Sequence, residues 1–150
     1  MNFATATAES DRTSERSTLV AWSQSGYLLA SVLFTVGVLV QVYIAGMAVF
    51  VDSARWSSHV SFGTTLPIFL AAMFALALVG KLPRALKLLP VGIFALFFVQ
   101  FSTAHRFGSL VGAIHPVNAL VIFWLATVAV RRAWPLAVGR PPSPETETKT

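Results

Sequence analysis

From Tyr27 to Val51 the sequence runs without one charged side chain. About 20 predominantly apolar residues are enough for a helix to cross the hydrocarbon core of a bilayer, which is about 30 Å thick. Three further stretches share this character, and over the whole chain 55% of the residues are hydrophobic and only 11% are charged. These are too few polar groups to cover the surface of a water-soluble domain of 150 residues. Part of the surface must therefore face lipid.

The apolar stretches predict four transmembrane helices with short connections. The predicted spans cover residues 27–51, 58–80, 88–104 and 110–130, inside a single membrane domain at 25–134. Residues 1–24 and 135–150 are polar or proline-rich and have no apolar period, so we expect two disordered cytoplasmic tails. The predicted fold is therefore an all-α, integral membrane four-helix bundle with up-down-up-down topology.

The basic residues at the ends of the spans predict the orientation. On the side of the two chain ends there are nine: Arg12, Arg16, Lys81, Arg84, Lys87, Arg131, Arg132, Arg140 and Lys149. The opposite side has two, Arg55 and Arg106. Short loops rich in Lys and Arg stay in the cytoplasm, so both chain ends are expected inside a plasma membrane, with all three histidines on the extracytoplasmic side. The basic residues are not clustered with aromatic ones, so the net charge of +5 does not indicate a nucleic-acid partner.

Several kinds of chemistry lack the residues that they need. The chain has no cysteine, which removes disulfides, thiolate metal sites and covalent heme attachment. The predicted spans contain no Asp, Glu, Lys or Arg, which argues against ion-coupled transport. No Ser-His-Asp set or carboxylate pair is present. These features favour a protein that is not an enzyme by itself.

A weak internal repeat relates the two helical hairpins. The sequence around Gln41 (Val-Gln-Val-Tyr-Ile-Ala) resembles the sequence around Gln100 (Val-Gln-Phe-Ser-Thr-Ala). His59 follows Gln41, and His115 follows Gln100, at a similar spacing, so each histidine opens the inward-running helix of its own hairpin. The repeat predicts two histidines at the same depth in the membrane.

Small residues follow both histidines. Gly63 and Ala119 come four positions after His59 and His115, and so lie on the same helix face one turn deeper. A flat ligand between the two imidazoles would need small side chains there. Small residues also favour close helix packing in lipid without any ligand, and this alternative stays open.

Two prolines lie close to these positions. Pro67 and Pro116 lack the amide hydrogens that would bond to the carbonyls of Gly63 and Gly112, so both inward-running helices are expected to bend locally.

The histidine pair suggests a cofactor. Neutral imidazole is a strong ligand of heme iron, and two imidazoles from facing helices can hold a b-type heme without a covalent bond. We therefore consider heme b bound by His59 and His115, with electron transfer as its role because both axial positions of the iron are filled. His105 and Arg106 could pair with the heme propionates. The alternative is that the outer-end histidines merely rest in the headgroup layer.

Three segments carry a resemblance to known families: Gln41-Val-Tyr-Ile-Ala-Gly46, the region of His59, and Ile114-His-Pro-Val-Asn-Ala119. They resemble a family of uncharacterised small four-span bacterial and archaeal membrane proteins, over about residues 27–133. More distantly, the chain resembles one four-helix half of heme A synthase. That resemblance implies heme ligation by the two histidines. This chain lacks the outer cysteine pair and the functional glutamate that the family carries in the first outer loop, so a heme b protein of similar architecture is implied rather than the synthase activity.

Two rival interpretations remain. The first is a non-catalytic subunit or scaffold that packs against a larger membrane complex, or against copies of itself, and needs no cofactor. The second is a quinone- or lipid-binding module formed by Gln41, Gln100, His105 and Arg106 at the outer interface. The electron-transfer hypothesis calls for a redox partner, and all three interpretations place the chain in the lipid bilayer.

Overall fold

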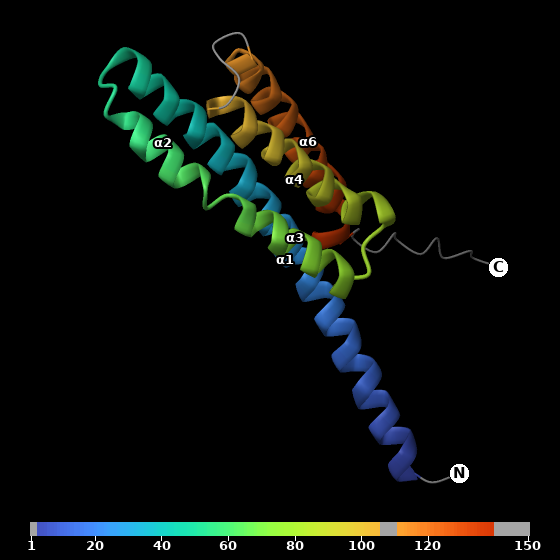
Figure 1. Cartoon of the computed structure of the whole chain (residues 1–150). Coiled ribbons are helices and arrows are strands. Elements are labelled where there is room, and N and C mark those ends of the chain that lie inside the picture. The colour runs from blue at the N-terminus through green and yellow to red at the C-terminus, as the bar shows by residue number, and fades with distance from the viewer. Residues whose placement is uncertain (1–2, 106–110, 140–150) are drawn as a thin grey trace, which may run out of the picture.

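The computed structural model of the chain describes residues 3–105 and 111–139, and these are almost entirely helical. The helices are α1 (Phe3–Phe50), α2 (Arg55–Gly63), α3 (Pro67–Val79), α4 (Arg84–His105) and α6 (Ile114–Ala137). Figure 1 shows them side by side along one direction, with α1 extending beyond the others at its N-terminal end. The helix α1 packs against α3 and α6, and α4 packs against the same two helices, so the four long elements form a bundle.

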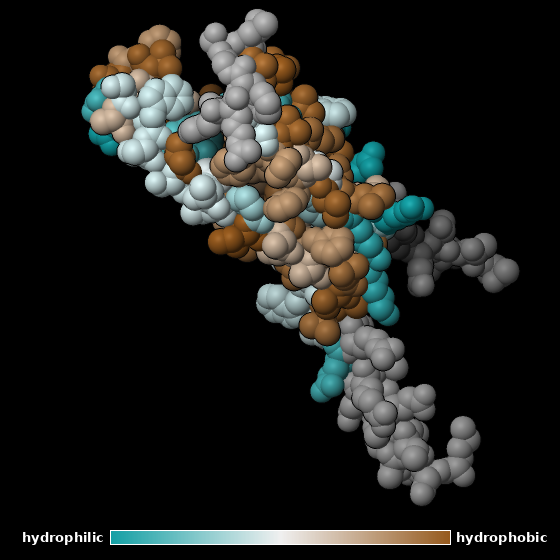
Figure 2. All heavy atoms as spheres, in the orientation of Figure 1, coloured by the Kyte–Doolittle hydropathy of each residue, from teal (hydrophilic) through white to brown (hydrophobic). Residues whose placement is uncertain are grey.

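Four segments are long and apolar enough to cross a membrane: Thr18–Phe50, Arg55–Val79, Arg84–Thr103 and Ile114–Ala137. The second of these joins α2 and α3. Large apolar side chains such as Leu29, Phe98 and Trp124 are exposed on the outside of the bundle, and apolar atoms cover much of its surface in Figure 2. This surface suits lipid rather than water. The prediction of an all-helical, four-span membrane bundle is confirmed.

The first helix differs from expectation at its start. The sequence predicts a disordered tail over residues 1–24, whereas the structure has a helix from Phe3 onward that runs without interruption into the first span. Starting a helix is costly because several residues must be fixed for one hydrogen bond, but extending an existing helix adds one bond for each residue fixed. A polar segment joined to a long apolar helix can therefore continue it. Of the expected C-terminal tail, residues 135–137 complete α6, and residues 140–150 lie outside the described part of the chain.

Burial follows the internal repeat closely. In the outward-running helices α1 and α4, buried residues recur 59 positions apart: Tyr27 and Leu86, Ser31 and Pro90, Phe34 and Ile93, Val38 and Phe97. In the return helices α3 and α6 and the turn before α3, they recur 56 positions apart: Leu66 and Ile122, Leu70 and Ala126, Met73 and Ala129, Ala77 and Ala133. The two hairpins thus use the same positions to build one core, as the pseudo-repeat predicted.

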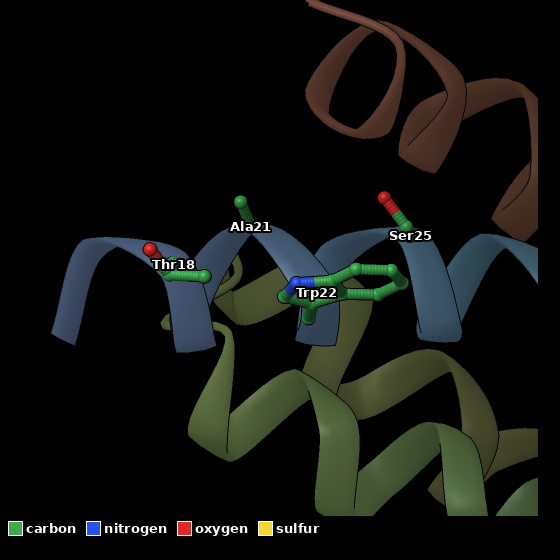
Figure 3. Close-up of a pocket in the computed structure, with 4 residues that line it drawn as sticks. All are labelled: Thr18, Ala21, Trp22 and Ser25. Atoms are coloured by element: carbon green, nitrogen blue, oxygen red, sulfur yellow. The ribbon is translucent and has the colours of Figure 1, made fainter. Parts of the chain in front are cut away.

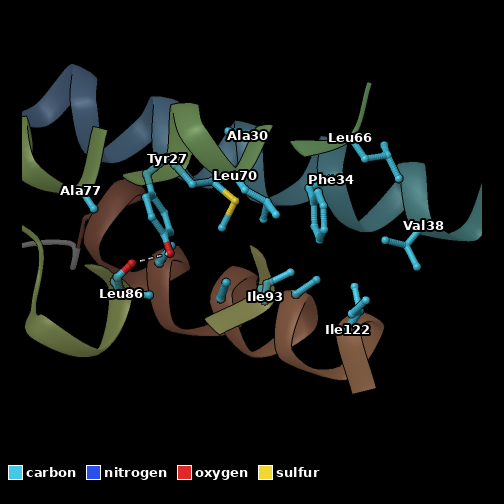
Figure 4. Packing of buried hydrophobic residues seen from close by; sticks show 14 of the residues in the cluster. Tyr27, Ala30, Phe34, Val38, Leu66, Leu70, Ala77, Leu86, Ile93 and Ile122 are labelled. Atoms are coloured by element: carbon cyan, nitrogen blue, oxygen red, sulfur yellow. Dashed lines mark hydrogen bonds between the residues drawn. The ribbon is translucent and has the colours of Figure 1, made fainter. Parts of the chain in front are cut away.

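Side-chain size differs between the two return helices at matching positions. The helix α3 buries Leu70 and Met73, whereas α6 buries Ala126 and Ala129. Small residues let helix backbones approach closely, and large residues opposite them fill the remaining space. Figure 4 shows this core, with Phe34 and Ile93 among the side chains that meet inside the bundle.

Pro67 interrupts the second span, in agreement with the local distortion predicted at this position. The helix α2 ends at Gly63, a short turn follows, and α3 begins at Pro67 itself. The Gly63 carbonyl, which cannot receive a bond from proline, instead accepts one from the Leu66 amide at 3.3 Å. Pro116 lies in the first turn of α6, where a missing amide hydrogen leaves no helical bond unmade.

A third proline accounts for the hydrogen bond of a fully buried tyrosine. Pro90 lies inside α4 and has no amide hydrogen for the carbonyl of Leu86, four positions earlier. That carbonyl accepts a hydrogen bond of 2.9 Å from the hydroxyl of Tyr27, which is fully buried on α1 (Figure 4). A carbonyl left unpaired in the apolar interior is unfavourable, and the tyrosine hydroxyl supplies the hydrogen bond that the proline cannot donate.

Candidate functional site

The first histidine of the predicted pair is oriented by its own hairpin. His59 is half-buried on the short helix α2, and its Nδ1 lies 3.1 Å from the backbone oxygen of Gln41 on α1. A carbonyl oxygen can only accept, so Nδ1 carries the proton and donates it. This bond fixes the tautomer and the direction of the ring, and it leaves Nε2 as the nitrogen with a lone pair.

The second histidine has the same arrangement. His115 is half-buried near the start of α6, and its Nδ1 lies 3.1 Å from the backbone oxygen of Gln100 on α4. The repeat therefore extends from sequence to hydrogen bonding, because each imidazole donates to the carbonyl of the repeat-related glutamine.

The two imidazole rings face each other across the bundle. Their centroids are 6.1 Å apart and their planes are inclined by 51°. Within the described residues α2 and α6 make no close backbone approach, so the side chains alone span the distance between these helices. In Figure 1 the end of the α1–α2 hairpin stands apart from the end of the α4–α6 hairpin. The predicted juxtaposition of His59 and His115 is present.

The depth of the pair follows from the helix register. Tyr27 is bonded to Leu86, and Gln41 and Gln100 come at the same distance along the chain after these two, from position 27 to 41 and from 86 to 100. At the helical rise of about 1.5 Å per residue, both histidine-bearing levels are about 21 Å from the Tyr27 level. The two histidines therefore lie at the same level along the bundle, far from the Tyr27–Leu86 bond.

One residue beside His115 was not predicted from the sequence to belong to the site. Asn118 is only 7% exposed, and its amide nitrogen lies 2.9 Å from the Leu96 backbone oxygen and 2.6 Å from Gln100 Oε1. It thereby ties α6 to α4 one turn below the histidine. The signal was available, because a polar side chain inside an apolar span normally faces the bundle and finds a partner there.

The matching place beside His59 is different. Phe62 stands where the repeat would place an asparagine, and it cannot donate to Gln41. Accordingly Gln41 Oε1 is buried without a hydrogen-bond partner. The amide of Gln41 lies over Gly63, where an added methyl group would overlap its Nε2. The space above Gly63 that the sequence assigned to a flat ligand is thus taken by the Gln41 amide.

For the remaining predicted site residues the structure gives the position in the chain but no contact with the histidine pair. Ala119 is half-buried on α6 and follows Asn118 directly. His105 is the last residue of α4, and Arg106 lies outside the described residues. A convergence of these two with Gln41 and Gln100 around a quinone stays a prediction.

A metal at this site would have two imidazole ligands. In the part of the chain that the structure describes, no group of three or more His, Cys, Asp or Glu side chains could hold a metal ion. Histidines that bind a metal through one nitrogen almost always donate the other N–H to a carbonyl, a carboxylate or water. Both histidines here make that second bond. The same bonds also tie each return helix to its partner without any metal.

Two hollows lie away from the histidines. One, of about 400 Å³, is lined by Thr18, Ala21, Trp22 and Ser25 on α1 (Figure 3). The other, of about 200 Å³, lies between α3 and α4 and is lined by Leu70, Ala71, Phe74, Pro90, Val91 and Phe94. Neither lining contains a titratable side chain, so neither suggests chemistry of its own.

Fold and site together define a small multi-pass helical membrane protein with two opposed histidines near one end. Residues 41–107 match the model of a family of unknown function, DUF6220. The matched region begins at Gln41 and contains His59 and Gln100, but it ends before His115. No curated protein and no solved structure matches the chain. The resemblance to an uncharacterised family therefore has support over this region, and no link to heme A synthase is shown.

Proposed function

We propose that the protein binds one b-type heme between His59 and His115 and takes part in electron transfer within the membrane. The observation that carries the proposal is the matched pair of histidines: two rings 6.1 Å apart, each with its Nδ1 on a backbone carbonyl. In this proposal Nε2 of each ring is the iron ligand, and the pair lies in the extracytoplasmic leaflet because the basic residues gather at the other end.

The distance between the rings supports the proposal. A metal-bound imidazole nitrogen lies about 2 Å from the metal, so two nitrogens on opposite sides of one ion are about 4 Å apart. The centre of an imidazole lies about 1 Å behind its coordinating nitrogen, which places the two ring centres about 6 Å apart. The ring separation of 6.1 Å agrees with this value.

The supporting hydrogen bonds favour the same chemistry. A carbonyl on Nδ1–H fixes the ring and makes Nε2 more basic, which strengthens its bond to a metal. Two imidazoles would fill both axial positions of the iron and leave none for a substrate, which favours electron transfer over oxygen chemistry. The redox partner would have to approach the end of the bundle where α2 and α6 begin.

Absorption spectroscopy tests the proposal. The full chain, expressed with ample heme and purified in detergent, should give a six-coordinate b-type spectrum in both its oxidised and its dithionite-reduced form. His59→Ala and His115→Ala should each abolish the six-coordinate spectrum. His105→Ala is the matched control and should keep it, because this third histidine is not one of the two ligands. A colourless protein, or a spectrum that survives both substitutions, would exclude the proposal.

A second candidate is a membrane subunit without a cofactor, in which the histidines only hold the hairpins together. The same two bonds to Gln41 and Gln100 favour it, because each ties a return helix to its partner. This candidate predicts that both His→Ala variants lose stability in the colourless protein and that heme does not change their unfolding.

A further inference from the structure

We propose that the protein binds an anionic phospholipid at the end of the bundle opposite the histidine pair. In this proposal the phosphate of the lipid lies between Arg84 and Lys87, in the first turn of α4, and one acyl chain lies in the groove between α3 and α4. In Figure 1 the start of α4 lies at the same end of the bundle as the end of α6, away from the helix starts that carry the histidines. The site is separate from the proposed heme site and does not depend on it.

The groove between α3 and α4 is apolar along its whole length. It has a volume of about 200 Å³, and its lining consists of Leu70, Ala71, Phe74, Pro90, Val91 and Phe94. Leu70 and Pro90 are buried, whereas Phe74 and Phe94 are partly exposed on the outside of the bundle. A hydrocarbon chain can pack against such a surface, and a polar ligand would find no hydrogen-bonding side chain there.

The two cations continue the α4 side of this groove toward the helix start. Lys87 precedes Val91 by four residues, and Arg84 precedes Lys87 by three. Residues three or four apart lie on the same helix face. At a rise of about 1.5 Å per residue, Lys87 is about 10 Å from the level of Phe94, so one lipid can reach both the cations and the groove.

Neither cation is neutralised by the protein. No Asp or Glu occurs between Ser53 and Pro144, a stretch that contains α3, α4 and α6. Arg84 is exposed and Lys87 is half-buried, and neither forms an ion pair with another described residue. The positive end of the helix dipole lies at a helix start, so two cations there repel the dipole as well as each other, and a bound anion would offset both effects.

The loop before α4 fixes the backbone of both cations. Leu82 is buried beside the helix start, and Leu86 is buried between the two cations. The Gly80 carbonyl accepts a hydrogen bond of 3.1 Å from the side chain of Gln24 on α1. The start of α4 is therefore held against the rest of the bundle before a lipid binds, which lowers the ordering cost of binding.

An anionic phospholipid uses both parts of this site. Free phosphate would leave the groove empty, and a zwitterionic lipid brings an ammonium group that the two cations repel. Basic pockets between membrane helices are a common way to bind anionic head groups, and Lys and Arg stems can lie along apolar surface while their charges reach the head group.

Native mass spectrometry of the full chain in detergent, titrated with dioleoyl phosphatidylglycerol, tests the proposal. We expect one tightly bound lipid, and binding of dioleoyl phosphatidylcholine at least about tenfold weaker. The double variant Arg84→Gln, Lys87→Gln should weaken phosphatidylglycerol binding about tenfold, because both charge contacts are lost. The double variant Arg131→Gln, Arg132→Gln is the matched control. It removes the same charge from the same end of the bundle on α6, which does not line the groove, so binding should change by less than about threefold.

A second pair of variants tests the groove itself. Ala71 lines the groove and is exposed, so the larger side chain of Ala71→Leu would occupy the space of the acyl chain and should weaken binding about fivefold. Ala75 is also exposed on α3 but does not line the groove, and Ala75→Leu should leave binding unchanged. Circular dichroism would confirm that all four variants keep their helical content.

The outcomes that would overturn the proposal are distinct. Equal affinity for the two lipids, or equal losses in the two double variants, would mean that only the overall positive charge attracts lipid to this end. Equal effects of Ala71→Leu and Ala75→Leu would mean that no acyl chain occupies the groove. None of these measurements involves heme, so a protein that takes up no heme overturns the proposed function and leaves the lipid site to be decided by this titration.

Discussion

The two hairpins of this bundle share a framework and differ in how it is completed. In both, an outward-running helix carries a glutamine whose backbone carbonyl accepts a hydrogen bond from Nδ1–H of a histidine on the return path. In the second hairpin the return helix is continuous and Asn118 locks the glutamine side chain. In the first, the return path is broken before Pro67, and the glutamine side chain has no partner for Oε1.

The comparison separates what the bundle needs from what is particular to one half. Matching buried positions recur throughout both hairpins, so helix packing alone accounts for the core. The asparagine, the continuous helix and the alanine-rich face belong to the second hairpin only. In the second hairpin the asparagine pairs the glutamine side chain with the return helix, and in the first hairpin that pairing is missing.

Removal of Asn118 should have the largest effect on stability. Asn118→Leu takes away two interhelical bonds and leaves Gln100 Oε1 buried without its donor. We expect a loss of about 2 kcal/mol in the free energy of unfolding, since each such bond in a membrane is worth about 0.6 to 1.7 kcal/mol. Unfolding by SDS in mixed micelles, followed by circular dichroism, would measure it.

Phe62→Asn, added to the Asn118→Leu variant, tests whether an asparagine at this position stabilises the bundle by bonding to the neighbouring glutamine. Placed in the first hairpin, the amide should restore part of the lost stability only if Gln41 accepts its hydrogen. A loss below about 0.5 kcal/mol for Asn118→Leu would remove the proposed difference between the hairpins.

Loss of the Tyr27–Leu86 hydrogen bond, which joins the hairpins at the other end of the bundle, should have the next largest effect on stability. Tyr27→Phe leaves the Leu86 carbonyl unpaired, and we expect it to cost about 1 kcal/mol. Tyr43→Phe is the control, because Tyr43 is 67% exposed and should change nothing. Unfolding in the same micelles measures both variants.

Substitution of Pro90 allows a stricter test of the Tyr27 prediction. Pro90→Ala restores an amide hydrogen for Leu86, so Tyr27→Phe should cost much less in that background than in the wild type. Equal costs in the two backgrounds would mean that the tyrosine does not compensate for the proline.

The sequence allowed the number of spans, the repeat and the facing histidines to be predicted, because each follows from a regular spacing. Apolar length defines the spans, and the similar distance from glutamine to histidine brings His59 and His115 to one level. The start of α1 at Phe3 could not be predicted in this way. The polar residues there have no apolar period, and they are helical because they extend the helix of the first span.

The details around the histidines depend on pairs that no spacing reveals. Whether a glutamine amide is paired is decided by a single residue on the next helix, Asn118 in one hairpin and Phe62 in the other. The partner of Tyr27 is likewise set by a missing hydrogen on Pro90, far along the chain.

The smallest expected effect on stability concerns the glycine below His59. Gly63→Ala gives the first hairpin the residue that the second has at Ala119, and its methyl group would displace the Gln41 amide. Because that amide is the end of a flexible side chain with an unpaired oxygen, we expect the free energy of unfolding to change by less than about 0.5 kcal/mol. The side-chain amide resonances of Gln41 should nevertheless shift in NMR spectra. Gly46→Ala, with open space around the added methyl group, should leave them unchanged. A loss of about 2 kcal/mol at Gly63 would instead show that Gln41 is held as firmly as Gln100, and that the two hairpins are equally rigid at this level.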